Sequence, residues 1–358
     1  MKSMRKLTCK TQNTNSTQIL IENGLKDHIF ELEQFFGAYR NMVIITDRNV
    51  AKHHLVSLKK QLKSFGGTVY GIVIEPGEQS KNLSTLEHIY YELSEYGITR
   101  SDAIIALGGG VVGDIAGFAA ATYMRGIDFY QVPTSLIAQV DSSVGGKTGV
   151  DLTVGKNLVG AFYPAKAVIV DPNYLKTLDD HFLMDGMGEV IKYGCISSSK
   201  LFVRLMGYEY QEDLLDDMED IVTKCLQIKR NVVEEDERES GVRRILNFGH
   251  TIGHVIETYF DYGTYTHGEA VAIGMYNITR MSVREGITPE ENLKNIAVLL
   301  DTYGLPKDLP EMDENRVKHI LNNDKKFEGD ILNVCVIPKI GVAEIVRVHK
   351  DKAFQLFT

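Results

Sequence analysis

The richest group of residues capable of chemistry lies between Arg243 and His267. Within it, Arg243, Asn247, His250 and His254 follow one another at intervals of four, three and four residues. If this stretch is helical, the intervals place all four side chains on one stripe of the helix. A stripe that carries a guanidinium, an amide and two imidazoles is typical of a site rather than of core packing. The spacing alone nominates His250 and His254 as joint metal ligands.

A carboxylate and a third imidazole are available to the same site. Glu189 and Lys192 stand three residues apart in another helical pattern, and His267 follows the histidine pair. One carboxylate and two imidazoles suit a zinc-like cation, and a set of three protein ligands that leaves one position open is typical of a catalytic site. The residues therefore predict a catalytic metal site.

A glycine fingerprint precedes this region. Gly108-Gly109-Gly110-Val111-Val112-Gly113 satisfies G-x-G-x-x-G, directly after the apolar run 103–107 and before the helical pattern 114–121. This context is typical of a dinucleotide site, because glycines let the backbone approach a pyrophosphate at a helix N-terminus. A tight turn without a ligand is the alternative. No acidic residue stands at the usual ribose distance after the fingerprint, which argues against an ordinary Rossmann domain.

The segment 141–157 is predicted to be a flexible, glycine-rich loop. It holds Asp141, Lys147, Lys156 and Asn157. Two lysines, an asparagine and glycines can cradle an anion, although a plain surface loop is the alternative. The P-loop pattern G-x-x-x-x-G-K-[ST] fails because Asp141 stands where a glycine is required, so an NTPase is not expected.

The elements around these motifs predict two domains. Apolar runs at 42–46, 68–74, 103–107, 129–132 and 167–170 alternate with helical patterns such as 49–65 and 87–96. They indicate a mostly parallel sheet with its ligand crevice at the carboxyl ends of the strands. From about residue 176, amphipathic stretches dominate (212–233, 253–259, 269–285 and 289–303), followed by a hairpin over 331–348 with a five-residue connection. We expect an α/β, Rossmann-like nucleotide-binding domain at 1–175 and a mainly α-helical metal- and substrate-binding domain at 176–358.

Composition narrows the class of protein. The 358 residues exceed one ordinary core, and 44% apolar with 24% charged residues is normal for a soluble globular chain. The formal net charge of −9 argues against nucleic acid or an anionic membrane as the main partner, but a locally basic pocket could bind an anion. Four widely separated cysteines form no CxxC pair, and neither a signal peptide nor a membrane span is expected. A cytosolic protein is predicted.

Taken together, the motifs resemble those of the 3-dehydroquinate synthase family, a group of sugar phosphate cyclases distantly similar to metal-dependent glycerol dehydrogenases. The resemblance rests on segments 108–114, 132–148, 155–157, 188–192, 246–254 and 267–270. It runs from about Asp47 to Lys326, in order and with the family's spacing. The first 40 residues match weakly.

The resemblance implies a role for each matching residue. The metal ligands would be Glu189, His250 and His267, usually with zinc or cobalt, and His254 would then face the substrate. NAD would be bound by Asp47, Asn49, Lys52, Glu78, Lys81, Gly109, Gly110, Val111, Asp114, Thr134 and Ser135, together with Asp141, Lys147, Lys156 and Asn157. The substrate would be held by Arg125, Asp141, Lys147, Asn157, Lys192, Lys229, Arg243, Asn247, His254 and one of Lys325 and Lys326. Arg125 would reach the neighbouring subunit's site, which implies a homodimer.

The implied reaction converts 3-deoxy-D-arabino-heptulosonate 7-phosphate to 3-dehydroquinate and phosphate in the shikimate pathway. Its steps are transient oxidation by NAD, phosphate elimination, reduction, ring opening and intramolecular aldol closure. Another sugar phosphate cyclase, such as amino-dehydroquinate synthase or 2-deoxy-scyllo-inosose synthase, is the nearest alternative. A metal-dependent polyol dehydrogenase and a non-catalytic NAD-binding protein are more distant ones. Lys229, Arg243 and Asn247 favour an acid substrate, whose carboxylate needs a partner.

Overall fold

The computed structural model describes residues 4–10, 16–25, 29–237, 239, 241–322, 327–328, 330–349, 352 and 354–357. The chain forms two compact units, one of Met1–Asp179 with Leu215–Glu234 and one of Asp180–Leu214 with Glu235–Thr358. The sequence predicts that the chain passes from the first domain to the second only once, near residue 175. In the structure, the chain returns to the first unit through helix α9 (Met218–Glu235). Amphipathic spacing predicts a helix here, but it does not say which core the helix covers.

The first unit is built on a seven-stranded sheet in the order β1-β2-β9-β6-β5-β3-β4. All neighbouring strands are parallel except β1 and β2, which are antiparallel. The strands are β1 (Arg5–Lys10), β2 (Ser16–Ile21), β3 (Asn41–Asp47), β4 (Thr68–Ile74), β5 (Ala103–Gly108), β6 (Asp128–Pro133) and β9 (Ala167–Val170). The central strands β5 and β9 are buried along their whole length, as expected for parallel strands covered on both faces.

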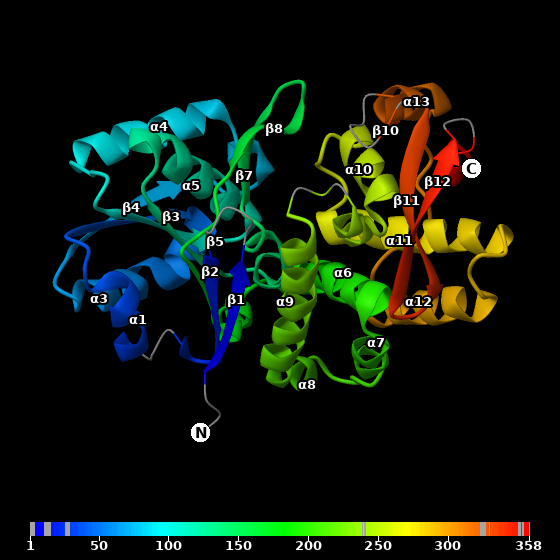
Figure 1. Cartoon of the computed structure of the whole chain (residues 1–358), viewed down its shortest axis with the longest axis horizontal. Coiled ribbons are helices and arrows are strands. Elements are labelled where there is room, and N and C mark those ends of the chain that lie inside the picture. The colour runs from blue at the N-terminus through cyan, green and yellow to red at the C-terminus, as the bar shows by residue number, and fades with distance from the viewer. Residues whose placement is uncertain are drawn as a thin grey trace. The chain divides into compact units, whose positions relative to one another are not determined.

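Helices cover both faces of this sheet (Figure 1). In Figure 1, α1 and α3 lie on one side of the sheet, and α4 and α5 lie on the other. The α-helices of this unit before α9 are α1 (Ile29–Phe36), α2 (Arg48–Val50), α3 (Val56–Lys63), α4 (Leu83–Glu95) and α5 (Gly110–Thr122). Each strand that the apolar runs predict in this unit is present, and β1 and β2 add a pair that the weakly matching first 40 residues did not reveal.

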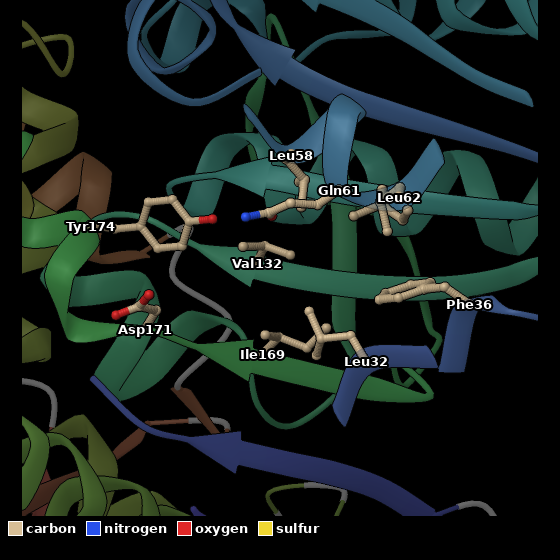
Figure 2. Close-up of a pocket in the computed structure, with 10 residues that line it drawn as sticks. Leu32, Phe36, Leu58, Gln61, Leu62, Val132, Ile169, Asp171 and Tyr174 are labelled. Carbon is tan, nitrogen blue, oxygen red and sulfur yellow. The ribbon is translucent and has the colours of Figure 1, made fainter. Parts of the chain in front are cut away.

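The face that α1 and α3 cover holds a large hydrophobic core cluster of the unit. Leu32 and Phe36 of α1 and Leu58 of α3 pack there against buried strand residues such as Val132 and Ile169. A small cavity lies within this packing and is lined mainly by apolar side chains (Figure 2). Because most of its lining belongs to the core cluster, we interpret it as a packing gap rather than a ligand site.

The second unit is mainly helical. Its α-helices are α6 (Asp180–Ser197), α7 (Ser199–Leu205), α8 (Gln211–Asp216), α10 (His250–Tyr259), α11 (His267–Arg284), α12 (Glu290–Thr302) and α13 (Glu314–Asn322). The strands β10 (Phe327–Glu328), β11 (Ile331–Lys339) and β12 (Val342–His349) form an antiparallel sheet. Lys339 pairs with Val342, so the connection has two residues rather than the predicted five, and Gly341 adopts the positive φ that this turn needs. No helix in the described part of the chain has the length and apolar composition needed to span a membrane.

Candidate active site

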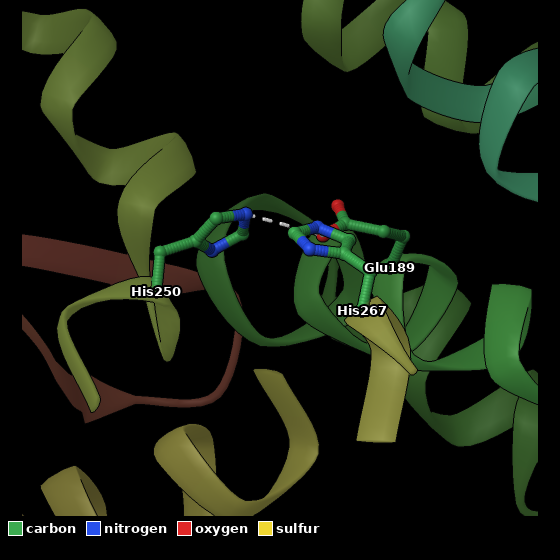
Figure 3. Close-up of side chains that lie close together, drawn as sticks. All are labelled: Glu189, His250 and His267. Carbon is green, nitrogen blue, oxygen red and sulfur yellow. Dashed lines mark ion pairs between the residues drawn. The ribbon is translucent and has the colours of Figure 1, made fainter. Parts of the chain in front are cut away.

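Glu189, His250 and His267 lie together in the second unit and point toward one another (Figure 3). Oε1 of Glu189 lies 3.3 Å from Nε2 of each histidine, and the candidate ligand atoms all lie within 4.8 Å of one another. The carboxylate is buried, and neither of its oxygens makes a well-aligned hydrogen bond to a described residue. A buried carboxylate that faces two imidazole nitrogens fits a divalent cation such as zinc.

Glycines at helix contacts bring these three side chains together. A Cβ on Gly188 would lie 2.7 Å from the Gly268 carbonyl oxygen, and one on Gly268 would lie 1.8 Å from the Asp185 carbonyl oxygen. Helices α6 and α11 therefore touch through their backbones beside Glu189 and His267. A Cβ on Gly249 would likewise lie 2.6 Å from a carbonyl oxygen of α11, which brings the start of α10 against α11. Each candidate ligand is the chain neighbour of a glycine that permits this close approach.

Backbone contacts orient the start of each helix. Asp185 accepts hydrogen bonds from the backbone N–H groups of Gly268 and Glu269, and Thr266 and Glu269 form a capping box at the same helix end. Nδ1 of His250 lies 3.1 Å from the carbonyl oxygen of Phe248, and its Nε2 faces Glu189. These contacts fix the directions from which the imidazoles approach the site.

The electrostatics of the cluster favour a charged carboxylate. Burial opposes ionisation of Glu189, but Lys192, followed by His250, holds the pKa of Glu189 well below its ordinary value. Burial lowers the pKa of His250, so that imidazole is neutral at neutral pH. Burial also opposes charge on His267, but Glu257 and Glu189 raise the pKa of His267 well above its ordinary value. Because a ligating imidazole nitrogen must carry no proton, a metal ion competes with a proton for His267.

Other predicted residues surround this cluster within the second unit. Lys192, which is 1% exposed, forms an ion pair with Glu189. The ring of His254 lies 5.4 Å from that of His250 and 6.4 Å from that of His267, measured between centroids. His254 is thus a neighbour of the cluster rather than one of its three members, unlike the pairing that spacing nominates.

The predicted continuous stripe from Arg243 to His254 is wrong. Residues Val242–Asn247 form a 3₁₀ helix, and Gly249, at φ 82°, separates it from α10. Gly249 permits the close contact with α11, since a Cβ at this position would lie 2.6 Å from the Val271 carbonyl oxygen. Its positive φ ends the 3₁₀ helix before α10 begins. Arg243 is nonetheless buried, and it donates to the backbone carbonyl of Glu237. Asn247 donates to the Glu239 carboxylate at 2.6 Å.

In the first unit, the predicted nucleotide residues follow the carboxyl ends of four adjacent strands. Asp47 ends β3 and caps α2 by accepting from the N–H groups of Asn49 and Val50. Glu78 and Lys81 follow β4; Gly109, Gly110, Val111 and Asp114 follow β5; Thr134 and Ser135 follow β6; and Lys52 lies in the π-helix Ala51–Leu55. The N–H of Thr134 donates to the Gly108 carbonyl, which joins the β5 and β6 ends. This edge is where parallel sheets bind ligands.

A buried lysine organises charges at this edge. Nζ of Lys81 lies 2.7 Å from Glu78, 3.4 Å from Asp114 and 3.7 Å from Asp151, and Nζ of Lys156 lies 3.2 Å from Glu78. Burial opposes ionisation of Glu78, but Lys81 and Lys156 lower the pKa of Glu78 to about 2. Burial raises the pKa of Asp114 to about 6 despite the nearby Lys81. The structure thus brings four predicted NAD contacts into one network.

The segment 141–157 is a hairpin rather than the predicted flexible loop. It begins in the π-helix Ala138–Ser142 and continues as strands β7 (Lys147–Leu152) and β8 (Gly155–Phe162). The glycines serve the pairing, because a Cβ on Gly160 would lie 2.1 Å from the Thr148 carbonyl oxygen. Asp141 pairs with Lys229 of α9 at 3.0 Å, while the side chain of Lys147 is exposed.

Comparisons with known proteins identify the family. Residues 71–185 match the model described as 3-dehydroquinate synthase N-terminal, and residues 186–327 match the model described as 3-dehydroquinate synthase C-terminal. The chain is 49% identical to a 3-dehydroquinate synthase of Clostridium acetobutylicum over 95% of this chain and 96% of that protein. It belongs to the 3-dehydroquinate synthase family. A 3-dehydroquinate synthase of Clostridium kluyveri is also 49% identical, over 95% of this chain and 94% of that protein.

A solved structure supports the fold. This chain resembles the structure of a 2-deoxy-scyllo-inosose synthase in complex with carbaglucose-6-phosphate, NAD⁺ and Co²⁺. The match covers 99% of this chain and 99% of that chain, with a TM-score of 0.85 and 26% sequence identity. Membership of the 3-dehydroquinate synthase family confirms the resemblance, the α/β and helical fold class, and a cyclase of the lyase type.

The predicted residues Lys325 and Lys326 lie outside the described residues.

Sequence reasoning missed Asp151 and Asp185, and also Glu257, whose Oε1 lies 3.4 Å from Nδ1 of His267. Asp151 joins the Lys81 network, accepts from the N–H of Asn157 at 2.7 Å, and donates its own N–H to the Lys81 carbonyl. Asp185 caps α11 and lies four residues before Glu189, an interval that places both on one face of α6. That interval was a usable signal for Asp185, whereas the bridge from the hairpin to Lys81 is visible only in three dimensions.

Proposed function

We propose that the chain converts 3-deoxy-D-arabino-heptulosonate 7-phosphate to 3-dehydroquinate and phosphate. The observation that carries this proposal is the three-residue cluster of Glu189, His250 and His267 in a chain of the 3-dehydroquinate synthase family. A set of three ligands leaves a coordination position for an oxygen of the substrate. Such a set suits chemistry better than a purely structural role, for which a fourth protein ligand is usual.

NAD and one divalent metal ion are part of the proposal. Zinc or cobalt would be held by Glu189, His250 and His267, and NAD by the residues at the carboxyl ends of β3 to β6. When bound, NAD supplies hydride transfer and the metal supplies a Lewis acid. The support for both is the fit of the residues: a buried donor set in the second unit, and a glycine turn at the start of α5 in the first.

The basic residues near these clusters would bind the anionic ends of the substrate. Lys192 and Arg243 are buried in the second unit, and Lys147 is exposed on the β7–β8 hairpin of the first. We assign Arg243, with Asn247, to the carboxylate, because a guanidinium offers a fixed fork of donors. We assign His254, Lys192, Lys229, Asp141, Asn157 and Lys147 to the remaining substrate groups. These residues orient the substrate and neutralise its charge, and such positioning is a main source of catalysis.

A homodimer and a cytoplasmic location complete the proposal. Arg125 is exposed, and its backbone has a φ of 65° in the turn before β6. We assign it to the site of the neighbouring subunit. Sedimentation of the purified protein tests the dimer, and a monomer at micromolar concentration would contradict this assignment.

Phosphate release tests the function. The purified chain with NAD and zinc is incubated separately with the heptulosonate phosphate and with glucose 6-phosphate, and phosphate and NADH are measured. We expect phosphate from the acid substrate, none from glucose 6-phosphate and no accumulation of NADH. Release from glucose 6-phosphate would instead identify an inosose-type cyclase, and NADH that accumulates without phosphate would identify a dehydrogenase.

Arg243→Lys tests the carboxylate assignment. We expect kcat/KM for the acid substrate to fall about 10- to 100-fold, because lysine keeps the charge but loses a charge-assisted contact of about 1.5–3 kcal/mol. Steady-state phosphate release measures the effect. Arg244→Lys, at a half-buried position beside it, is the control and should change kcat/KM by less than about twofold. Equal losses in the two variants would refute the assignment of Arg243.

A further inference from the structure

Glu257 lies beside Nδ1 of His267, the ring nitrogen that is turned away from the candidate metal site. Its Oε1 lies 3.4 Å from Nδ1 of His267, while Nε2 of the same ring lies 3.3 Å from Glu189. The imidazole therefore stands between two carboxylates, one at each ring nitrogen. Glu257 is 6% exposed, and a buried carboxylate is costly unless it serves as a partner to another group.

The position of Glu257 ties two of the candidate ligands together. Glu257 belongs to α10, the helix that begins at His250, and it lies two helical turns after that histidine. His254 lies between them at helical spacing, so all three side chains share one face of α10. His267 begins α11, which packs closely against α10 through Gly249. One helix thus supplies one metal ligand and the partner of another.

Capping of α11 does not account for this contact. Asp185 and Glu269 already satisfy backbone N–H groups at the start of that helix. Glu257 instead reaches the ring of His267. In metal sites, a carboxylate at the second ring nitrogen selects the tautomer, fixes the ring orientation and raises the basicity of the ligating nitrogen.

We propose that Glu257 is a positioning residue for the metal site: its carboxylate accepts a hydrogen bond from Nδ1–H of His267 and so directs Nε2 of that ring toward the ion. This inference rests on the metal-dependent activity proposed above. At His250, the group beside Nδ1 is the neutral carbonyl of Phe248, whereas at His267 it is the carboxylate of Glu257. The two imidazoles should therefore differ in basicity. Nε2 of His267 would therefore be the stronger electron-pair donor to the metal.

Glu257→Gln tests the proposal, because it keeps the size of the side chain and removes its charge. Zinc affinity is measured by competition with a chromogenic chelator, without NAD or sugar phosphate. We expect the affinity to fall about 10- to 100-fold, as is usual when an outer partner of a metal ligand is lost. The visible absorption spectrum of the cobalt-loaded variant should also shift, because the field of one ligand changes.

Glu219→Gln is the matched control. Glu219 is also a buried glutamate, 8% exposed, but it lies in the first unit, where it pairs with Arg5 and accepts from the N–H of Asn23. Its substitution should lower the thermal stability of the metal-free protein and leave zinc affinity within about twofold. If Glu257→Gln retains the zinc affinity and cobalt spectrum of the unmodified chain, the proposal is overturned.

The measurement also separates this inference from the proposed function. A chain whose zinc affinity depends on Glu257 but which releases no phosphate from the heptulosonate phosphate would overturn the function and leave the role of Glu257 standing. A chain that releases phosphate while Glu257→Gln binds zinc normally would do the reverse. An unmodified chain that binds no zinc or cobalt would overturn both.

Discussion

Prolonged dialysis against a strong chelator is expected to reduce phosphate release by at least about 10³-fold, because the Lewis acid contributes several kcal/mol to transition-state stabilisation. The loss should be reversible. Lys192 remains as a buried partner for the Glu189 carboxylate when the metal leaves, so the second unit keeps its fold. Added zinc or cobalt should then restore activity, and the restored rate should titrate with one equivalent of metal per chain.

The control for this experiment is NAD binding, which depends on residues of the first unit. NAD affinity, measured by calorimetry, should change by less than about twofold on chelation. Phosphate release at the full rate from protein shown by elemental analysis to be metal-free would refute the metal assignment. Loss of NAD binding together with activity would show that chelation damages the fold, and would contradict the expected reversibility.

Gly268→Ala is expected to destroy the site through the backbone. The new Cβ would lie 1.8 Å from the Asp185 carbonyl oxygen, so α11 must move away from α6. This shift separates His267 from Glu189. We expect overpacking to cost about 3 kcal/mol or more in the free energy of unfolding. A displacement of about 1 Å should lower phosphate release by about 10²-fold or more.

Gly263→Ala is the matched control, because a Cβ there would lie 3.9 Å from its nearest neighbour, the Phe260 carbonyl oxygen. Denaturant unfolding, zinc affinity and phosphate release should all stay close to those of the unmodified chain. If Gly268→Ala behaves like this control, the close contact between α6 and α11 does not position the metal ligands.

Local patterns predicted the elements of the fold better than their assembly. The parallel strands were predictable because strands such as β5 and β9 are buried on both faces and read as continuous apolar runs. The return of α9 to the first unit was not predictable, since it depends on distant contacts such as Lys229 with Asp141. The β7–β8 hairpin was missed because its glycines, which permit close strand contacts, are also typical of loops.

The candidate site shows the same division. Residue types alone indicated a metal site with one carboxylate and two imidazoles, but helical spacing favoured His254 over His267. The structure groups His267 with Glu189 because α6 and α11 touch through Gly188 and Gly268, and helical spacing carries no information about such a contact. The spacing argument also assumed an unbroken helix, and the positive φ of Gly249 breaks it.

The placement of each candidate ligand beside a contact glycine has a consequence for unfolding. Glu189, His250 and His267 belong to three different helices, so a bound ion acts as a removable cross-link between α6, α10 and α11. Loops that are far apart in sequence would be closed by one small ion, much as a disulfide would close them. By mass action, free zinc at 100 times its dissociation constant would add about 2.7 kcal/mol to the stability of the folded second unit. Because the first unit holds none of these ligands, added metal should raise the melting temperature of the second unit more than that of the first.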